Sequence, residues 1–151
     1  MNIVIDANAL AFYLLNHLDL TAPIENVIER EVVSLRAPSL WRSELQSVLM
    51  EYVQYDGSDV PGGDLTLDEA IEHMSDADLL VNSIPLTGSE PILRLAYSSG
   101  CSTYDCQYVH LADTTGTQVL TWDKQMLNNF PQVAFTPEDF AAQLDAGEEG
   151  E

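Results

Sequence analysis

The sequence predicts a single α/β domain built around a parallel sheet. Short apolar segments typical of strands alternate along the chain with longer segments of helical periodicity, which is the pattern of parallel sheets. The chain has 151 residues and is 46% apolar, the size of one domain with a sizeable core. We expect a folded domain over residues 1–144 and an acidic flexible tail, rich in Gly and Glu, over residues 145–151.

The first strand is the segment around which the rest is expected to be arranged. Residues 1–5 are mostly apolar and are followed by Asp6, so they predict a buried strand after which the chain leaves the sheet. Ligands of open α/β sheets bind just beyond the carboxyl ends of the strands. Asp6 is therefore expected where a functional site is usually found.

Helices and a second strand are expected next. A helix is predicted over about residues 8–17, and a second short helix is predicted from Thr21, with Pro23 near its first turn. Residues 32–35 predict the second strand, because three of these four side chains are apolar and two are β-branched.

A long amphipathic helix and a loop come next in the sequence. Apolar side chains recur at helical spacing over residues 41–52, which predicts a helix with one buried face. Residues 55–64 are rich in Gly, Asp and Pro and predict a loop. Thr66 and Glu69 form the pattern of a capping box, which predicts a helix that runs to about residue 81.

The second half of the chain predicts two further strands and four further helices. In order, we expect an extended piece over 83–87, a helix from 89 to Gly100, a helix that Thr103 caps and Gly116 ends, a strand over 118–122, a short helix after Asp123, a strand over 133–135 and a last helix that begins at Pro137. Tyr104, Tyr108 and Leu111 are spaced so as to share the buried face of the helix that Thr103 caps.

Acidic residues dominate the composition. The chain has 25 Asp and Glu against five Lys and Arg, a formal net charge of −20. High net charge often indicates disorder, but the apolar content and the aromatic residues favour a folded protein. In molar salt the Debye length falls to about 3 Å, which screens the repulsion between surface acids. We therefore expect an acid-coated surface suited to a halophilic host.

The sequence favours a cytoplasmic protein with reduced cysteines. No apolar run approaches the ~20 residues of a membrane-spanning helix. The first residues have no basic region and do not show the pattern of a signal peptide. Cys101 and Cys106 have no companions at zinc-ligand spacing, so they are expected to be semi-buried free thiols.

Four acids stand at positions where side chains can converge, two after strands and two in the first turns of helices: Asp6, Asp123, Glu44 and Asp105. Each also has a structural explanation, such as helix capping or a favourable interaction with a helix dipole. Together at one edge of a sheet, four carboxylates would repel one another unless a divalent cation lay among them. Oxygen ligands of this kind suit Mg²⁺ or Mn²⁺, which can activate water for phosphodiester hydrolysis.

Four segments carry these acids in a recognisable order: 3–10 (IVIDANAL), 37–45 (APSLWRSEL), 104–112 (YDCQYVHLA) and 120–124 (LTWDK). Together they resemble the pattern of PIN-domain proteins, and more narrowly of VapC-type toxin ribonucleases. The resemblance covers nearly the whole chain. It implies a three-layer α/β/α PIN-like fold with a central parallel sheet.

The resemblance also implies a function. It implies an Mg²⁺- or Mn²⁺-dependent endoribonuclease that hydrolyses RNA and acts as the toxin of a type II toxin–antitoxin pair. Asp6, Asp105 and Asp123 would bind the metal, and Glu44 would join them directly or through water. Members of the family commonly form homodimers and are silenced by an antitoxin protein, so both partners are expected here.

Two small polar residues and two bases complete the expected site. Asn8 and Thr121 occupy positions where such proteins use small polar side chains to support the metal ligands. Arg42 and Lys124 lie next to site acids in the sequence and are candidates for contacts with phosphate, or else solvated surface residues. The scarcity of bases departs from usual nucleic-acid binding, which draws on basic patches.

Other functions stay open at this point. The chain could be a PIN nuclease of RNA processing without an antitoxin, and a neighbouring antitoxin gene would decide between these roles. It could also be a catalytically silent PIN-like interaction module, although the presence of all four acids argues against that. A phosphatase with an Asp nucleophile would need a second Asp where the chain has Asn8.

Overall fold

The structure, a computed structural model, describes residues 1–15, 18–30, 33–53 and 64–149. Five strands form one sheet: β1 (Asn2–Ile5), β2 (Ser34–Pro38), β3 (Val81–Ile84), β4 (Val119–Leu120) and β5 (Ala134–Phe135). Their order across the sheet is β3-β2-β1-β4-β5, and every neighbouring pair is parallel. The parallel sheet expected from the sequence is therefore confirmed.

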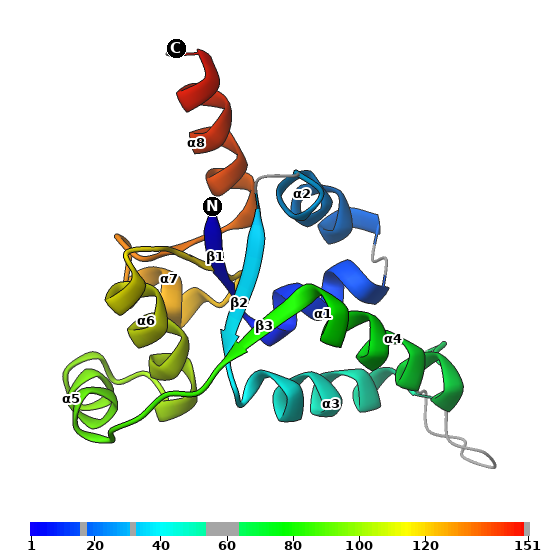
Figure 1. The fold of residues 1–151 in the computed structure, drawn as a ribbon, viewed down its shortest axis with the longest axis horizontal. Coiled ribbons are helices and arrows are strands. Elements are labelled where there is room, and N and C mark those ends of the chain that lie inside the picture. Colours follow the sequence, from blue (N-terminus) through cyan, green and yellow to red (C-terminus); the bar gives the residue numbers. More distant parts are fainter. Residues whose placement is uncertain (16–17, 31–32, 54–63, 150–151) are drawn as a thin grey trace.

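Helices cover both faces of this sheet. They are α1 (Ala7–Leu15), α2 (Leu18–Ile28), α3 (Trp41–Tyr52), α4 (Leu67–Leu80), α5 (Glu90–Ser99), α6 (Thr103–Thr115), α7 (Lys124–Asn129) and α8 (Pro137–Glu149). In Figure 1, α1, α3 and α4 lie on one side of the strands, and α5, α6 and α7 lie on the other. This confirms the three-layer α/β/α arrangement.

The central strand β1 is buried on both faces. Ile3, Val4 and Ile5 are at most 1% exposed, which explains why the sequence is continuously apolar there rather than alternating. On α3, Trp41, Leu45 and Leu49 are spaced four residues apart and are buried in the same core. Because this face of α3 is buried in the core, the opposite face of the helix points away from the core.

Several predicted helix ends are confirmed. Thr66 and Glu69 form the capping box of α4, since each side chain bonds to the backbone amide of the other residue. Gly100 and Gly116 end α5 and α6 with φ of +74° and +66°, a left-handed conformation that glycine adopts without strain. The cap of α6 is a correction, because Ser102 rather than Thr103 accepts the hydrogen bond from the amide of Asp105.

The boundaries of α2 and β2 differ from the sequence prediction. Helix α2 begins at Leu18, so Pro23 lies inside the helix instead of in its first turn. Buried Ile24 and Val27 anchor that segment, and this packing outweighs the poor helix propensity of proline. Strand β2 begins at Ser34 and includes Pro38, which pairs with β3 because the fixed φ of proline suits an extended strand end. The loop expected over residues 55–64 lies, apart from Asp64, outside the described residues.

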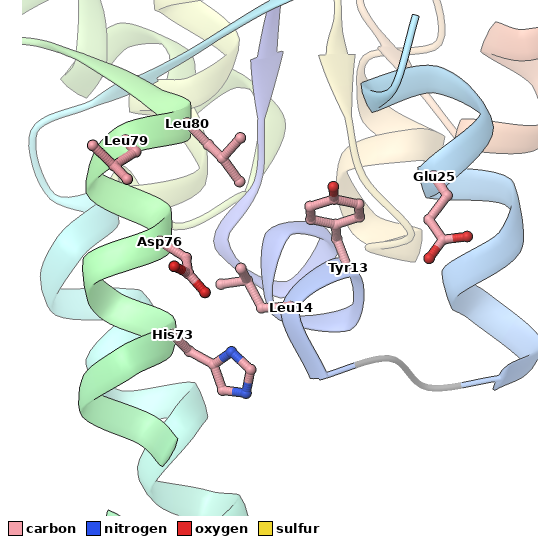
Figure 2. Close-up of a pocket in the computed structure, with 7 residues that line it drawn as sticks. All are labelled: Tyr13, Leu14, Glu25, His73, Asp76, Leu79 and Leu80. Atoms are coloured by element: carbon pink, nitrogen blue, oxygen red, sulfur yellow. The ribbon is translucent and has the colours of Figure 1, made fainter. Parts of the chain in front are cut away.

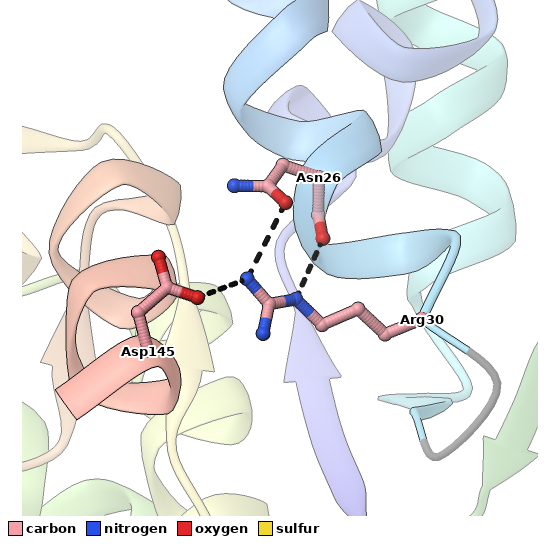
Figure 3. A network of polar contacts seen from close by, with 3 residues as sticks. All are labelled: Asn26, Arg30 and Asp145. Carbon is pink, nitrogen blue, oxygen red and sulfur yellow. Dashed lines mark hydrogen bonds and ion pairs between the residues drawn. The ribbon is translucent and has the colours of Figure 1, made fainter. Parts of the chain in front are cut away.

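The C-terminal helix continues past the boundary at residue 145 that the sequence predicted for a flexible tail. Helix α8 runs to Glu149. Figure 3 shows that Asp145 of this helix forms an ion pair with Arg30, which follows the end of α2. The two side chains are 2.8 Å apart. The Arg30 guanidinium also bonds to the Asn26 backbone and side chain, so it links α8 to α2. Within the described ranges, none of the helices combines the length and apolar character needed to cross a membrane.

Candidate active site

The four predicted acids line one pocket, of about 430 Å³, at the carboxyl edge of the sheet. The lining residues are Asp6, Ala7, Asn8, Leu40, Ser43, Glu44, Ser47, Val48, Tyr104, Asp105 and Asp123. The topology explains the convergence, because β1 and β4 are parallel neighbours and the Asp6 amide donates to the Leu120 carbonyl at 3.1 Å. The acids that follow these two strands therefore emerge at the same edge.

Asp6 is the most deeply buried of the four acids, at 7% exposed. The Thr121 hydroxyl donates to Asp6 Oδ2 at 2.8 Å in a fully buried contact. Burial above all, together with the negative charges of Glu44 and Asp105, raises the pKa of Asp6 to about 6, against the opposing effect of the Thr121 hydrogen bond. Asp6 is thus a carboxyl group whose charge is unfavourable in the absence of a cation.

Asp123 both caps a helix and lines the acidic pocket. Its Oδ1 accepts the Met126 amide at 2.8 Å and so caps α7, which is the structural role. It also lines the acidic pocket. The Asp123 amide donates to Thr121 Oγ1 at 3.0 Å. Thr121 therefore connects the two acids that follow β1 and β4.

Glu44 enters the pocket from the first turn of α3 and is half-buried. The Tyr108 hydroxyl, from α6, donates to Glu44 Oε1 at 2.7 Å. Burial raises the pKa of Glu44, and the charge of Asp105 adds to this effect, while the Tyr108 hydrogen bond opposes it. Sequence reasoning placed Tyr108 only on a buried face. Its position three residues after Asp105 on the same helix is the signal that could have indicated a place near the site.

Asp105 enters the pocket from the first turn of α6 and is also half-buried. Burial raises its pKa first and the charge of Asp123 raises it further, against the effect of the Ser102 hydrogen bond. Tyr104, expected in the core, is instead 61% exposed and lines the pocket. The reason is that Tyr104 lies in the first turn of α6 beside Asp105, where the helix borders the pocket.

The donor chemistry of this pocket suits a hard divalent cation, because carboxylate oxygens surround it and its lining contains no Lys, Arg or His. In the described residues, however, no group of three or more His, Cys, Asp or Glu side chains is arranged so that it could hold a metal ion. The four acids share a pocket but do not form a ready-made ligand set. The negative charges of the acids repel one another and raise the pKa values of Asp6 and Asp105. This repulsion favours carboxylates that stay apart when no cation is bound.

The two predicted phosphate-binding bases do not line the pocket. Arg42, on the outer side of α3, pairs with Asp78 of α4 at 2.6 Å and lies 5.0 Å from the centre of the Trp41 ring. Lys124 is exposed at the start of α7, directly after Asp123. Asn8, by contrast, lines the pocket.

A second pocket, of about 540 Å³, lies between α1, α2 and α4 and was not predicted. Figure 2 shows its walls, with His73 and Asp76 from α4 facing Leu14 of α1, and Glu25 on α2. The remaining lining residues are Tyr13, Leu79 and Leu80. None of the predicted site residues lines this second pocket.

Two solved structures have a similar fold. The structure of PAE2754 from Pyrobaculum aerophilum aligns with a TM-score of 0.71 at 20% identity, covering 97% of this chain and 96% of that one. The structure of VapBC2 from Rickettsia felis, bound to a DNA fragment from their promoter, aligns with a TM-score of 0.61 at 11% identity, covering 90% and 98%. No family model and no curated protein matches the sequence. The likeness confirms the PIN-like fold.

Proposed function

We propose that this chain is a PIN-domain endoribonuclease of the VapC type, which hydrolyses RNA phosphodiester bonds with Mg²⁺ or Mn²⁺. The observation that carries the proposal is the convergence of Asp6, Glu44, Asp105 and Asp123 on one pocket beyond the carboxyl ends of β1 and β4. The fold likeness to a VapBC2 structure supports the same assignment.

The four carboxylates that line the pocket would hold the cation. A bound cation would lower the pKa of a water molecule and stabilise the charge on the phosphate oxygens. Thr121 keeps the ends of β1 and β4 in register, since it bonds to both Asp6 and the Asp123 amide. The Asn8 side chain, at the wall of the pocket, is available as a neutral donor to a phosphate oxygen.

The charge of the pocket sets how RNA must bind. Because its lining contains acids and no base, phosphate is attracted only once a cation has offset the negative charge. With five Lys and Arg in the whole chain, few counterions are released from RNA on binding, so affinity should depend weakly on salt. We therefore expect RNA cleavage to persist in molar KCl, as in the cytoplasm of a halophilic host.

Cleavage of RNA by the purified protein in molar KCl, with Mn²⁺ or Mg²⁺, tests the proposal. Asp6→Asn and Asp123→Asn should each abolish cleavage, and EDTA should abolish it in the wild type. Asp113→Asn is the matched control, because Asp113 is an exposed acid on α6 outside the pocket. Cleavage that survives both pocket substitutions, or that ignores EDTA, would exclude the proposed site.

The proposal extends to a toxin role and to protein partners. We propose a homodimer that an antitoxin protein silences. If induced expression arrests growth and the product of a neighbouring gene relieves the arrest, the chain is a toxin. Cleavage of RNA without growth arrest would favour an RNA-processing nuclease. Lack of cleavage with every divalent cation tested would favour a silent interaction module.

A further inference from the structure

The contact between Tyr108 and Glu44 joins two helices that are far apart in the sequence. Glu44 lies in the first turn of α3, and Tyr108 lies in the middle of α6. The hydroxyl donates to Glu44 Oε1 at 2.7 Å, a short hydrogen bond of the kind made to a charged acceptor. One hydroxyl thus connects α6 to α3.

Packing alone does not account for a tyrosine at this position. The Tyr108 side chain is 1% exposed, and phenylalanine would fill almost the same volume without a polar atom to satisfy. A buried hydroxyl destabilises a protein unless it forms a hydrogen bond. The Tyr108 hydroxyl is therefore explained by the hydrogen bond that it makes to Glu44. That bond fixes one oxygen of a half-buried carboxylate in the acidic pocket.

We propose that Tyr108 is a positioning residue for the cation site, which holds Glu44 through Oε1 and leaves Oε2 as the ligand oxygen. The inference rests on the proposed function, because it assumes that Glu44 faces a divalent cation. Glu44 Oε2 accepts no hydrogen bond from the described residues, so it is available to a ligand. A glutamate has several rotatable bonds, and holding one of its oxygens reduces the freedom that must be lost when a cation binds.

Removal of such a supporting hydrogen bond typically weakens metal binding or activity by about 10- to 100-fold. We therefore expect Tyr108→Phe to weaken Mn²⁺ binding about 10-fold or more, measured by titration calorimetry on the purified protein without RNA. Circular dichroism should show an intact fold. Tyr97→Phe is the matched control, because Tyr97 is 94% exposed on α5, and it should bind Mn²⁺ like the wild type.

A double-mutant cycle separates positioning from packing. If Tyr108 acts through Glu44, Tyr108→Phe should have little further effect on Mn²⁺ affinity in a Glu44→Gln background. If the phenylalanine weakens Mn²⁺ binding by the same factor in both backgrounds, the effect comes from packing and the proposal is wrong. Unchanged affinity in the single variant would also overturn it.

The same titration distinguishes this inference from the proposed function. Wild-type protein that binds Mn²⁺ but cleaves no RNA would contradict the nuclease and leave the positioning role standing. Wild-type protein that cleaves RNA while Tyr108→Phe binds Mn²⁺ normally would contradict only the positioning role. Wild-type protein that binds no Mn²⁺ would contradict both.

Discussion

The Thr121 hydroxyl donates to Asp6 Oδ2 at 2.8 Å, across a separation of 115 residues in the sequence. The same hydroxyl oxygen accepts the amide of Asp123 at 3.0 Å. A single buried side chain therefore fixes the relation between the ends of β1 and β4, from which two of the four pocket acids emerge. Loss of the Thr121 hydroxyl should therefore affect both the two pocket acids and the stability of the fold.

Thr121→Val tests this relation with a side chain of nearly the same shape. The variant loses the donor to Asp6 and leaves a buried carboxylate short of one hydrogen bond, which should destabilise the fold by about 1–3 kcal/mol. Because that hydrogen bond lowers the pKa of Asp6, the pKa should rise further in the variant. Urea denaturation measures the change in stability, and the pH dependence of RNA cleavage reports the change in the pKa of Asp6. Thr121→Ser keeps the hydroxyl and should behave like the wild type, and a valine variant of unchanged stability would disprove the role.

Asp6 should make the stability of the metal-free protein depend on pH. Its pKa is raised from 3.8 to about 6 in the fold, so the folded state binds the proton more tightly than the unfolded chain. The stability from this group is complete below about pH 4 and is lost as the pH rises through about 6. Two pKa units correspond to about 3 kcal/mol, which is an upper value.

Comparison of the wild type with Asp6→Asn isolates that effect from the titration of the other acids. The asparagine cannot ionise and can still accept from Thr121, so the variant should lose less stability than the wild type between about pH 4 and 7. Urea denaturation in EDTA and high salt gives the two curves. Parallel curves over this range would show that Asp6 is not responsible.

A divalent cation should stabilise the folded protein. A ligand that binds only the folded state adds about 2.7 kcal/mol at 100 times its Kd, so Mn²⁺ should raise the melting temperature in a concentration-dependent way. Asp105→Asn should reduce this gain, because Asp105 is half-buried among the other acids. Differential scanning calorimetry with and without EDTA measures it. Equal stabilisation of wild type and variant would place the cation elsewhere.

The two candidate phosphate contacts should differ in importance. Arg42 and Asp78 form an exposed ion pair, of a kind worth at most about 1 kcal/mol, and Arg42 does not line the pocket. Lys124 has no ion-pair partner among the described residues and directly follows Asp123. Lys124→Ala should weaken RNA binding about tenfold, and Arg42→Ala should change it less than threefold, in filter binding with Ca²⁺ in place of Mn²⁺. The reverse order would mean that Arg42 leaves Asp78 to contact the substrate.

The sequence could predict the acids because their positions depend on local pattern. Asp6 and Asp123 directly follow segments with strand character, and parallel strands bring such residues to one edge. Tyr108 could not be assigned a site role in this way, because its partner Glu44 is 64 residues away and on a different layer. The pairing of Arg42 with Asp78 was equally hidden, since it depends on how α3 packs against α4.

The ends of secondary-structure elements were predicted only where the capping chemistry is local. Glu69 bonds to Thr66 within one turn, so the start of α4 could be read from two residues. The end of α8 could not, because the ion pair of Asp145 with Arg30 depends on the packing of α8 beside α2. Pro23 shows the same limit, since buried neighbours decide that the helix continues through it.

The cap that Asp123 provides for α7 has a consequence for how its chemistry can be studied. Oδ1 holds the Met126 amide, which is a task that asparagine performs about as well as aspartate. Asp123→Asn therefore removes the negative charge while it preserves the start of the helix. At this position the electrostatic and the architectural contributions of one carboxylate can be separated by a single atom exchange, oxygen for nitrogen.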